Sequence, residues 1–265
     1  MEMLSSKTMP KTALITGASS GIGYHLALIF AQKGYDLILV ARRLDKLNAL
    51  GQKIQKEYQQ KAIVIQADLA WPTTPLSIYQ KVQNLGIKLD LLVNNAGFGN
   101  YGFFAETDNA RAIDLIQVNI TSLTQLTKLF LADMLKAKTG AILNISSTAA
   151  FFPGPFMNTY FASKSYVLKF SVGLAVELKN TGVHVSCLCP GPTKNTEFGK
   201  HAYYPKKLKS FYMMSPEKLV NIAYRELMAK KIIIIPGLLN KFLVLLHRFF
   251  PLTITAKLVK ELSGF

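Results

Sequence analysis

Residues 16–23 read Thr-Gly-Ala-Ser-Ser-Gly-Ile-Gly. They connect a short apolar run, Ala13–Thr16, to a segment with helical periodicity, Gly21–Lys33. Three glycines between a strand and a helix allow a tight turn and a close approach of the backbone to a pyrophosphate group. The first turn of the helix then offers unpaired N–H groups and the positive end of the helix dipole. The stretch predicts a dinucleotide-binding turn directly after the first strand.

Short apolar runs and amphipathic segments alternate along the rest of the chain. Strands are predicted at Leu37–Ala41, Ala62–Gln66, Leu89–Asn94, Ala141–Ser146, Val183–Leu188 and Lys231–Ile235, and helices at Leu44–Gln59, Ala110–Lys136 and Asn158–Lys179. Nearly continuous runs of Val, Ile and Leu are typical of parallel strands that are covered on both faces. We therefore expect an α/β fold: a single-domain, Rossmann-like, doubly wound parallel sheet with helices on both faces.

The chain of 265 residues suits one large domain, and no stretch has the composition of an interdomain linker. We expect residues 1–236 to form the catalytic domain and residues 237–265 to be a C-terminal amphipathic helical extension of it. Residues 191–214 are the one long irregular stretch, and such loops usually serve a function, here as a substrate lid. The aromatic side chains of this stretch favour an apolar substrate. Its lysines either meet an anionic group of the substrate or only add solubilising charge.

The residues after the second predicted strand bear on the choice of cofactor. Sites for NAD(H) place an acid there, which hydrogen-bonds the ribose 2′-OH. This chain has Ala41 followed by Arg42 and Arg43, and a guanidinium pairs with a 2′-phosphate through charge-assisted hydrogen bonds. The pattern predicts NADP(H), with two solvated arginines at a helix start as the alternative. Asp68, after the third strand, either accepts from the adenine amino group or caps the segment that follows it.

A second group of polar residues predicts acid–base chemistry. Tyr160 and Lys164 are four residues apart and share one face of a predicted helix. A nearby ammonium lowers the pKa of a tyrosine, ordinarily about 10, and so makes it a better catalyst near neutrality. Ser147 ends a predicted strand, at the edge where open α/β sheets bind ligands, and can hydrogen-bond a substrate carbonyl. Asn119 either holds a water or the backbone in the site or serves only its own helix.

These motifs occur in the order found in the short-chain dehydrogenase/reductase family, which the chain resembles from about Lys11 to Ile235. The shared motifs are Thr16–Gly23, Asn94-Asn95-Ala96-Gly97, Asn119, Ser147, Tyr160-x-x-x-Lys164 and Pro190-Gly191. The resemblance implies a nucleotide-dependent oxidoreductase. The C-terminal tail resembles that of a bacterial branch of the family whose substrates are poorly defined.

The resemblance also implies roles for single residues. Tyr160 would be the general acid or base, Lys164 would lower its pKa and bind the nicotinamide ribose, and Ser147 would polarise the carbonyl. Asn119 would anchor a water that relays protons to Lys164. The expected cofactor contacts, with no metal, are Gly17, Ser19, Ser20, Gly21, Ile22, Gly23, Arg42, Arg43, Asp68, Asn95, Ala96, Gly97, Tyr160, Lys164, Pro190, Gly191 and Thr193. Thr196 is the alternative to Thr193, because the stretch after Pro190 is one residue longer than the usual family form.

Charge and cysteine usage narrow the partners and the compartment. The chain has 31 Lys and Arg against 15 Asp and Glu, a net charge of +16, which attracts anions. The lysines are spread along the chain and no motif is a known nucleic-acid reader, so we expect no nucleic-acid partner.

Cys187 and Cys189 lie in an apolar run, poorly placed to bond each other, and fit core packing in a reducing compartment. Residues 1–11 lack an apolar stretch of signal-peptide length, so a cytoplasmic location is expected.

The tail after Gly237 has an amphipathic pattern that ends at Pro251. Leucines and phenylalanines fall on one helical face and Asn240, Lys241, His247 and Arg248 on the other. Two alternatives stay open. The tail packs on its own domain or on a second subunit, or residues 237–260 rest on the inner face of a membrane.

We expect an NADPH-dependent oxidoreductase that moves a hydride between the nicotinamide and a carbonyl or alcohol carbon. The substrate expected is a hydrophobic ketone or aldehyde of an acyl, steroid-like or retinoid-like kind, and the family resemblance implies a homo-oligomer. The alternative is a non-catalytic NADP(H)-binding interaction protein at a membrane surface. The complete set of Asn119, Ser147, Tyr160 and Lys164 argues against that alternative, because a pure binding protein does not need all four.

Overall fold

The computed structural model of the chain describes residues 10–194 and 213–262. In these residues a seven-stranded sheet has the order β3-β2-β1-β4-β5-β6-β7, and every pair of neighbouring strands is parallel. The strands are β1 (Thr12–Thr16), β2 (Asp36–Ala41), β3 (Ala62–Gln66), β4 (Leu91–Asn94), β5 (Gly140–Ile145), β6 (Val183–Leu188) and β7 (Ile233–Ile234). The order reverses between β1 and β4, which confirms the predicted doubly wound parallel sheet.

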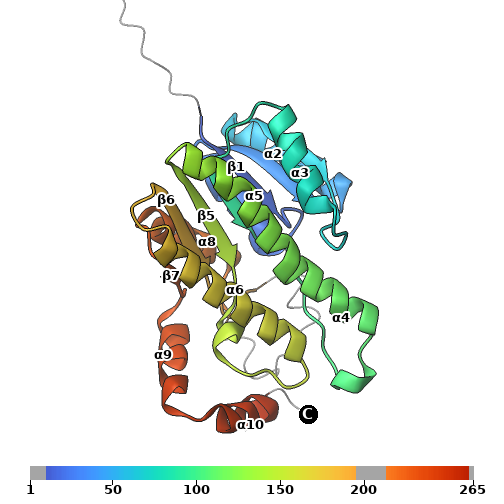
Figure 1. Cartoon of the computed structure of the whole chain (residues 1–265), viewed down its shortest axis with the longest axis vertical. Helices are drawn as coiled ribbons and strands as arrows, with labels where there is room; N and C mark the ends of the chain where they lie inside the picture. Colours follow the sequence, from blue (N-terminus) through green and yellow to red (C-terminus); the bar gives the residue numbers. More distant parts are fainter. Residues whose placement is uncertain (1–9, 195–212, 263–265) are drawn as a thin grey trace, which may run out of the picture.

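Helices cover both faces of the sheet, and the strands are apolar on both sides for that reason. Ile15 and Leu39 belong to one core, with α1 (Gly21–Gln32), α2 (Leu44–Tyr58) and α8 (Pro216–Met228). Leu14 and Ile38 belong to the other core, with α3 (Thr74–Asn84), α5 (Leu123–Lys136) and α6 (Asn158–Glu177). Figure 1 shows α5 and α6 lying across the near face of the sheet.

The predicted helix Ala110–Lys136 is interrupted. The structure divides it into α4 (Asn109–Ile116), the π-helical turn η2 (Gln117–Ser122) and α5. A π turn inserts an extra residue into a helix and is frequent at functional sites, and this one contains Asn119. The local pattern shows no sign of it, because the wide turn depends on contacts that Asn119 makes elsewhere in the fold.

Two helices, α3 and α8, were absent from the sequence prediction. Both begin with a proline in the first turn, where the missing N–H costs no hydrogen bond. In α8, Ser215 precedes Pro216 and its hydroxyl accepts from the Lys218 N–H at 3.3 Å, a regular N-cap. The sequence Ser215-Pro216 could have indicated the start of α8, which the pattern of hydrophobic residues alone does not.

Buried polar side chains fix the centre of the sheet. Asn94 donates through Nδ2 to Asn144 Oδ1 and to Thr127 Oγ1, each at 2.9 Å, and Asn144 Nδ2 donates to Ser171 Oγ at 2.9 Å. These bonds join β4 and β5 to α5 and α6, and a slip in register would leave them unpaired. Cys187 and Cys189 are buried and free, as predicted for core packing.

The tail forms α9 (Leu238–Leu246), the 3-10 turn η4 (His247–Phe249) and α10 (Leu252–Leu262). These elements lie at the end of the molecule toward which the arrowheads of the strands point (Figure 1). None of the described helices combines the length and the apolar character needed to cross a bilayer.

Two glycines give a matched test of the packing. Gly182, between α6 and β6, has φ +87°, and a Cβ there would collide with the Lys138 carbonyl. We expect Gly182→Ala to lower the free energy of unfolding by at least about 2 kcal/mol. Gly173 lies inside α6, and a Cβ added there would have nothing within 4 Å. Gly173→Ala should therefore raise the free energy of unfolding by about 0.5–1 kcal/mol. Urea denaturation of both variants measures the difference, and equal effects would contradict the packing described.

Candidate active site

The carboxyl ends of four adjacent strands bring the sequence motifs together. Gly17 follows β1, Asn95 follows β4, Ser146 and Ser147 follow β5, and Pro190 closely follows β6. Open α/β sheets bind ligands at this edge, in the crevice where the strand order reverses. The crevice here lies between β1 and β4, so the glycine-rich turn and the Asn95 loop form its two sides.

Thr16 and Asn95 lock these two sides to each other. The Thr16 hydroxyl accepts from the N–H groups of Asn95 and Ala96 at 2.9 and 3.0 Å, and Asn95 Nδ2 donates to the Thr16 carbonyl at 2.9 Å. A Cβ at Gly17 or at Gly23 would run into the Asn95 amide. The Asn95 side chain therefore shapes the turn itself, and Thr16 does so as well, although sequence reasoning assigned it no role of its own.

The turn leads into α1, whose N-terminus therefore follows the carboxyl end of β1. Gly17 and Gly21 have φ of +67° and +57°, a conformation that favours glycine. Ser20 is the N-cap residue, but its side chain makes no capping hydrogen bond. Ile22 and Gly23 lie in the first turn of the helix. This arrangement suits an anion at the helix start.

Arg43, rather than Arg42, reaches the glycine-rich turn. Its Nη2 donates to Ser19 Oγ at 2.9 Å and to Ser20 Oγ at 2.8 Å. The Arg42 side chain is 71% exposed, with Nη1 3.8 Å from Asp68 Oδ2. Asp68 Oδ1 accepts from the Ala70 N–H at 3.0 Å, so the local capping role that was the alternative for Asp68 is observed. Both arginines nevertheless stand at the carboxyl end of β2, where the prediction placed them.

Tyr160, Lys164 and Asn119 meet beyond the ends of β4 and β5. Tyr160 and Lys164 lie one turn apart on α6 and are 8% and 5% exposed. Lys164 Nζ donates to the Ile145 carbonyl at 2.9 Å and stands 5.8 Å from the centroid of the Tyr160 ring. A Cβ at Gly97 would lie 3.0 Å from Asn119 Oδ1 and 3.3 Å from Lys164 Nζ. The absence of a side chain at Gly97 therefore makes room for both groups.

Asn119 holds the backbone of the site. Its Oδ1 accepts from the Phe98 N–H at 3.2 Å, and its Nδ2 donates to the Phe98 carbonyl at 3.1 Å and to Ser163 Oγ at 3.0 Å. The π turn presents this amide to the loop after β4 and to α6 at the same time. Asn119 therefore bonds groups outside its own helix, and its part in a reaction stays a prediction.

Burial changes the acidity of the lysine. Desolvation lowers the pKa of Lys164 from 10.5 to about 8. The amine is therefore mostly protonated at neutral pH, although burial disfavours its charge. Lys164 thus places a buried positive charge near the Tyr160 ring.

The adjacent serines have different partners. The Ser146 hydroxyl is buried and donates to the Lys164 carbonyl at 2.7 Å. The half-buried Ser147 accepts from the Ala149 N–H at 3.1 Å and donates to the Pro190 carbonyl at 3.4 Å, a long contact. Ser147 is thus the less buried of the two serines, and its contact with a ligand stays a prediction. Ser146 supports α6, a role the sequence did not indicate.

Asn240 of α9 is a contact that sequence reasoning missed. It is 7% exposed and donates through Nδ2 to the Pro236 carbonyl. A Cβ at Gly191 would lie 2.5 Å from Asn240 Nδ2 and Oδ1, so the glycine of the Pro190-Gly191 motif lets the tail approach the site. The sequence analysis placed Asn240 on the face of the tail helix opposite the leucines and phenylalanines. The structure turns this amide inward onto Gly191, a contact that the pattern did not indicate.

The two ends of the expected lid are held together. Thr193 pairs with Met214 in a parallel bridge, and the Lys194 N–H donates to the Met214 carbonyl at 2.9 Å. Residues 195–212, which include Thr196 and the expected lid aromatics, lie outside the described residues. The choice between Thr193 and Thr196 therefore stays a prediction.

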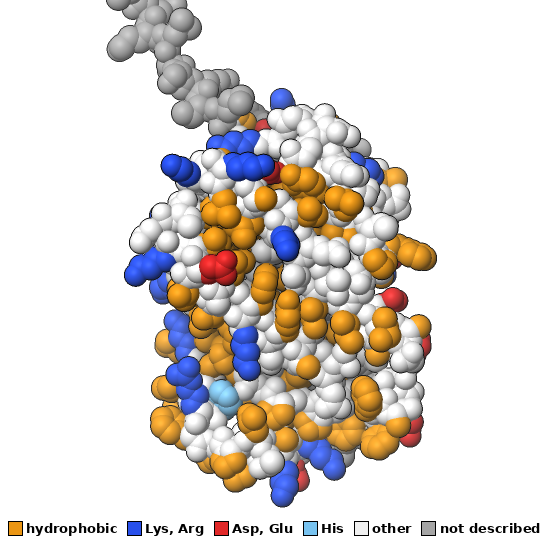
Figure 2. Space-filling model, in the orientation of Figure 1, with side chains coloured by type: hydrophobic (Ala, Val, Ile, Leu, Met, Phe, Trp, Pro, Cys, Tyr) orange, Lys and Arg blue, Asp and Glu red, His pale blue; other side chains and the backbone are white. Residues whose placement is uncertain are grey.

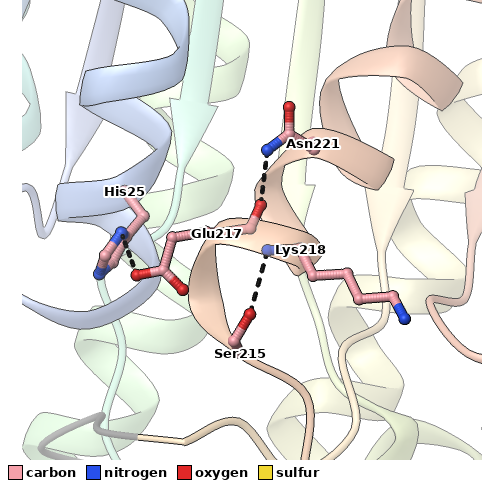
Figure 3. A network of polar contacts seen from close by, with 5 residues as sticks. All are labelled: His25, Ser215, Glu217, Lys218 and Asn221. Carbon is pink, nitrogen blue, oxygen red and sulfur yellow. Dashed lines mark hydrogen bonds and ion pairs between the residues drawn. The ribbon is translucent and has the colours of Figure 1, made fainter.

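A polar network joins the start of α8 to α1 (Figure 3). His25 Nδ1 is 3.5 Å from Glu217 Oε1, and Asn221 Nδ2 donates to the Glu217 carbonyl at 2.8 Å. Burial lowers the pKa of His25, and the nearby Glu217 carboxylate opposes that shift. The network attaches the helix after residues 195–212 to the helix that carries the glycine-rich turn.

A family model of short chain dehydrogenases matches residues 11–206, which include the glycine-rich turn, Asn119, Ser147, Tyr160 and Lys164. The chain belongs to the short-chain dehydrogenase/reductase family. This confirms the family inferred from the motifs and agrees with the strand order of the sheet.

Relatives within the short-chain dehydrogenase/reductase family have named activities. The very-long-chain 3-oxoacyl-CoA reductase of Phaeosphaeria nodorum is 37% identical over 180 residues, 66% of this chain and 53% of that protein. Human 17-beta-hydroxysteroid dehydrogenase type 3 is 36% identical over 188 residues, 69% of this chain and 59% of that protein. The chain therefore spans little more than half the length of these curated relatives.

Solved structures of the family match over nearly the whole chain. A short-chain dehydrogenase from Sphingobium yanoikuyae in complex with NADPH has a TM-score of 0.80 and 32% identity, covering 91% of this chain and 96% of that chain. The bulky-bulky ketone specific alcohol dehydrogenase of Comamonas testosteroni has a TM-score of 0.77 and 31% identity, covering 92% and 96%. The likeness extends past the end of the family model and agrees with a single Rossmann-like unit.

The buried lysine gives a direct test of the site. We expect one lysine ¹³Cε signal to titrate near pH 8, because burial disfavours its charged form. The signal should be missing in Lys164→Met. Since the folded pKa lies below the unfolded one, the folded chain binds fewer protons between these two values, and Lys164 adds stability as pH rises through them. Titration of every lysine near 10.5 would contradict the burial described.

Proposed function

We propose that the chain is an NADP(H)-dependent oxidoreductase that moves a hydride between the nicotinamide and a carbonyl or alcohol carbon of a hydrophobic substrate. The observation that carries the proposal is the buried Lys164 ammonium beside the Tyr160 ring. A lysine that only solubilised the surface would not be buried with its amine against a strand carbonyl.

The residues of the crevice fit a phosphorylated dinucleotide. Glycines stand where side chains would fill the turn, and the Ser20 side chain leaves the first turn of α1 uncapped. At the end of β2 there is Ala41 in place of an acid, and Arg43 lies against Ser19 and Ser20. A guanidinium with two hydroxyls is a donor set for a 2′-phosphate. NADP(H), when bound, would supply or accept the hydride.

Proton transfer to and from the substrate oxygen would depend on side chains of the protein. Tyr160 would donate a proton to the alkoxide oxygen formed in reduction, or accept one in oxidation. Lys164 would lower the pKa of that phenol through its charge. Ser147 would hydrogen-bond the same oxygen and hold the carbonyl in place. Asn119 would act as a positioning residue, through the Phe98 backbone and through Ser163 on α6.

The substrate class rests on the relatives. Their names refer to very-long-chain 3-oxoacyl-CoA, to 17-beta-hydroxysteroids and to bulky ketones. These substrates share a carbonyl or carbinol carbon on a large apolar frame. We therefore place a bulky hydrophobic ketone first among substrates, and a panel of 3-oxoacyl thioesters, oxosteroids and diaryl ketones is the screen that follows.

The cofactor preference is tested through the two arginines. Arg43→Ala should weaken NADPH binding by about 10-fold to 100-fold, the range of a lost charge-assisted hydrogen bond, and leave NADH binding within about 2-fold. Arg42→Ala is the control and should have the smaller effect, because its side chain points to solvent and to Asp68. Fluorescence titration with both nucleotides measures this. Equal affinities for NADPH and NADH that neither variant changes would remove the argument for NADP(H).

The chemistry is tested at Tyr160. Tyr160→Phe should lower kcat on a ketone of the panel by about 10²-fold to 10⁴-fold, the usual contribution of a general acid. NADPH affinity should change by no more than about 3-fold, because the phenyl ring keeps the packing. Wild-type turnover in Tyr160→Phe would rule out the proposed acid. Tight NADPH binding with no turnover across the panel would favour the non-catalytic alternative.

A further inference from the structure

The tail exposes an apolar surface that the site does not use. We define the tail surface as the exposed apolar side chains of α9, η4, α10 and their junction: Leu238, Leu239, Phe242, Leu245, Leu246, Phe249, Phe250, Leu252, Ile254 and Leu258. Leu238, Phe249 and Leu252 are 84%, 76% and 66% exposed. Large contiguous apolar patches are rare on monomeric soluble proteins and mark interaction sites.

The inward face of the tail is already occupied. Asn240 packs on Gly191 and Val244 is buried. The His247 ring lies edge-on to Phe151 and Phe152, with centroids 6.3 and 5.0 Å away. Rotating the helices to bury their leucines against the domain would break these contacts. The tail thus packs on its own domain through this inward face and leaves its leucines and phenylalanines exposed.

The charges around the tail surface indicate what covers it. Four exposed cations lie on the tail: Lys241, Arg248, Lys257 and Lys260. Residues 238–261 contain a single carboxylate side chain, Glu261. In a two-fold contact between copies each patch faces its own image, so these cations would be brought close to one another. Anionic lipid headgroups would instead pair with them, while the leucines and phenylalanines enter the acyl boundary.

We propose that the tail surface docks on an anionic lipid bilayer. Figure 2 shows hydrophobic side chains with Lys and Arg among them at the end of the molecule where Figure 1 places α9 and α10. The nine residues of α9 span about 14 Å, roughly half the thickness of a bilayer core. The two short helices, broken at Pro251, therefore lie along the membrane surface.

Docking has a consequence for the site. Because Asn240 on α9 contacts Gly191, the membrane-facing helix is packed directly on the loop that follows β6. A docked chain would hold the carboxyl ends of the strands near the interface, where bulky hydrophobic carbonyl compounds partition. This consequence rests on the proposed function, whereas docking itself rests only on the tail.

The test is sedimentation of the full chain with vesicles. We expect binding to vesicles of phosphatidylcholine mixed with phosphatidylglycerol and much weaker binding to phosphatidylcholine alone. Neutralising the tail cations should reduce binding by more than about 10-fold; the variant carries Lys241→Gln, Arg248→Gln, Lys257→Gln and Lys260→Gln. The matched control removes equal charge from exposed lysines elsewhere and should bind within about 2-fold of the wild type; it carries Lys81→Gln, Lys88→Gln, Lys128→Gln and Lys136→Gln.

A second pair of variants tests the apolar part. Leu238→Ser, Phe242→Ser and Phe249→Ser together should abolish binding, whereas Trp71→Ser, Leu85→Ser and Val176→Ser, also at exposed apolar positions, should not. Circular dichroism and NADPH titration establish that each variant is folded. If the wild-type chain itself does not bind NADPH, that result contradicts the proposed function and leaves the vesicle-binding result unchanged.

Three outcomes would overturn the proposal. The first is no binding of the wild-type chain to anionic vesicles. The second is an equal loss in the lysine control, which would assign binding to the overall charge of +16. The third is a dimer in analytical ultracentrifugation that the serine variant dissociates while vesicles are not bound, since a second copy would then cover the tail surface.

Discussion

The site is organised around the burial of the Lys164 amine against the Ile145 carbonyl. Removing an ammonium from water costs free energy unless polar groups surround it and the fold leaves enough space for it. Ser146 holds the backbone of the lysine, Asn119 fixes the loop beside it, and Gly97 leaves the space. The π turn in the long helix exists at the point where Asn119 must reach both that loop and α6. The residues that the family motifs mark separately therefore act as one packed unit.

The cofactor end depends on a different constraint, the close approach of two loops. Asn95 can bond the turn after β1 only because positions 17 and 23 lack side chains. The glycines usually explained by a ligand are thus already required by the protein's own hydrogen bonds. Arg43 adds a third element by bonding both serines of the turn, so the end of β2 and the start of α1 are tied together before any ligand is considered.

Local pattern predicted much of this, and its failures have physical causes. The strand Val183–Leu188 and the turn at 16–23 were correct because apolar runs and glycine spacing act locally. The sequence could not indicate that Arg43, and not Arg42, bonds the glycine-rich turn. Both adjacent arginines fit the motif, and only packing decides where each side chain points. Helical periodicity separated Asn240 from the leucines of the tail, but it could not indicate that this amide fits the gap left by Gly191. The inward amide also explains why the tail leaves its leucines outside.

The hydrogen bond between Thr16 and the Asn95 N–H joins residues 79 positions apart in the chain. Between them the chain runs through β2 and β3 on one side of β1 and then returns to its other side with β4. Contacts of such high sequence separation carry a large loop-closure entropy and slow the search for the native topology. The nucleotide crevice therefore exists only once β4 has paired with β1. A nascent chain that has emerged only as far as β3 carries the whole glycine-rich signature yet has no place to bind a nucleotide.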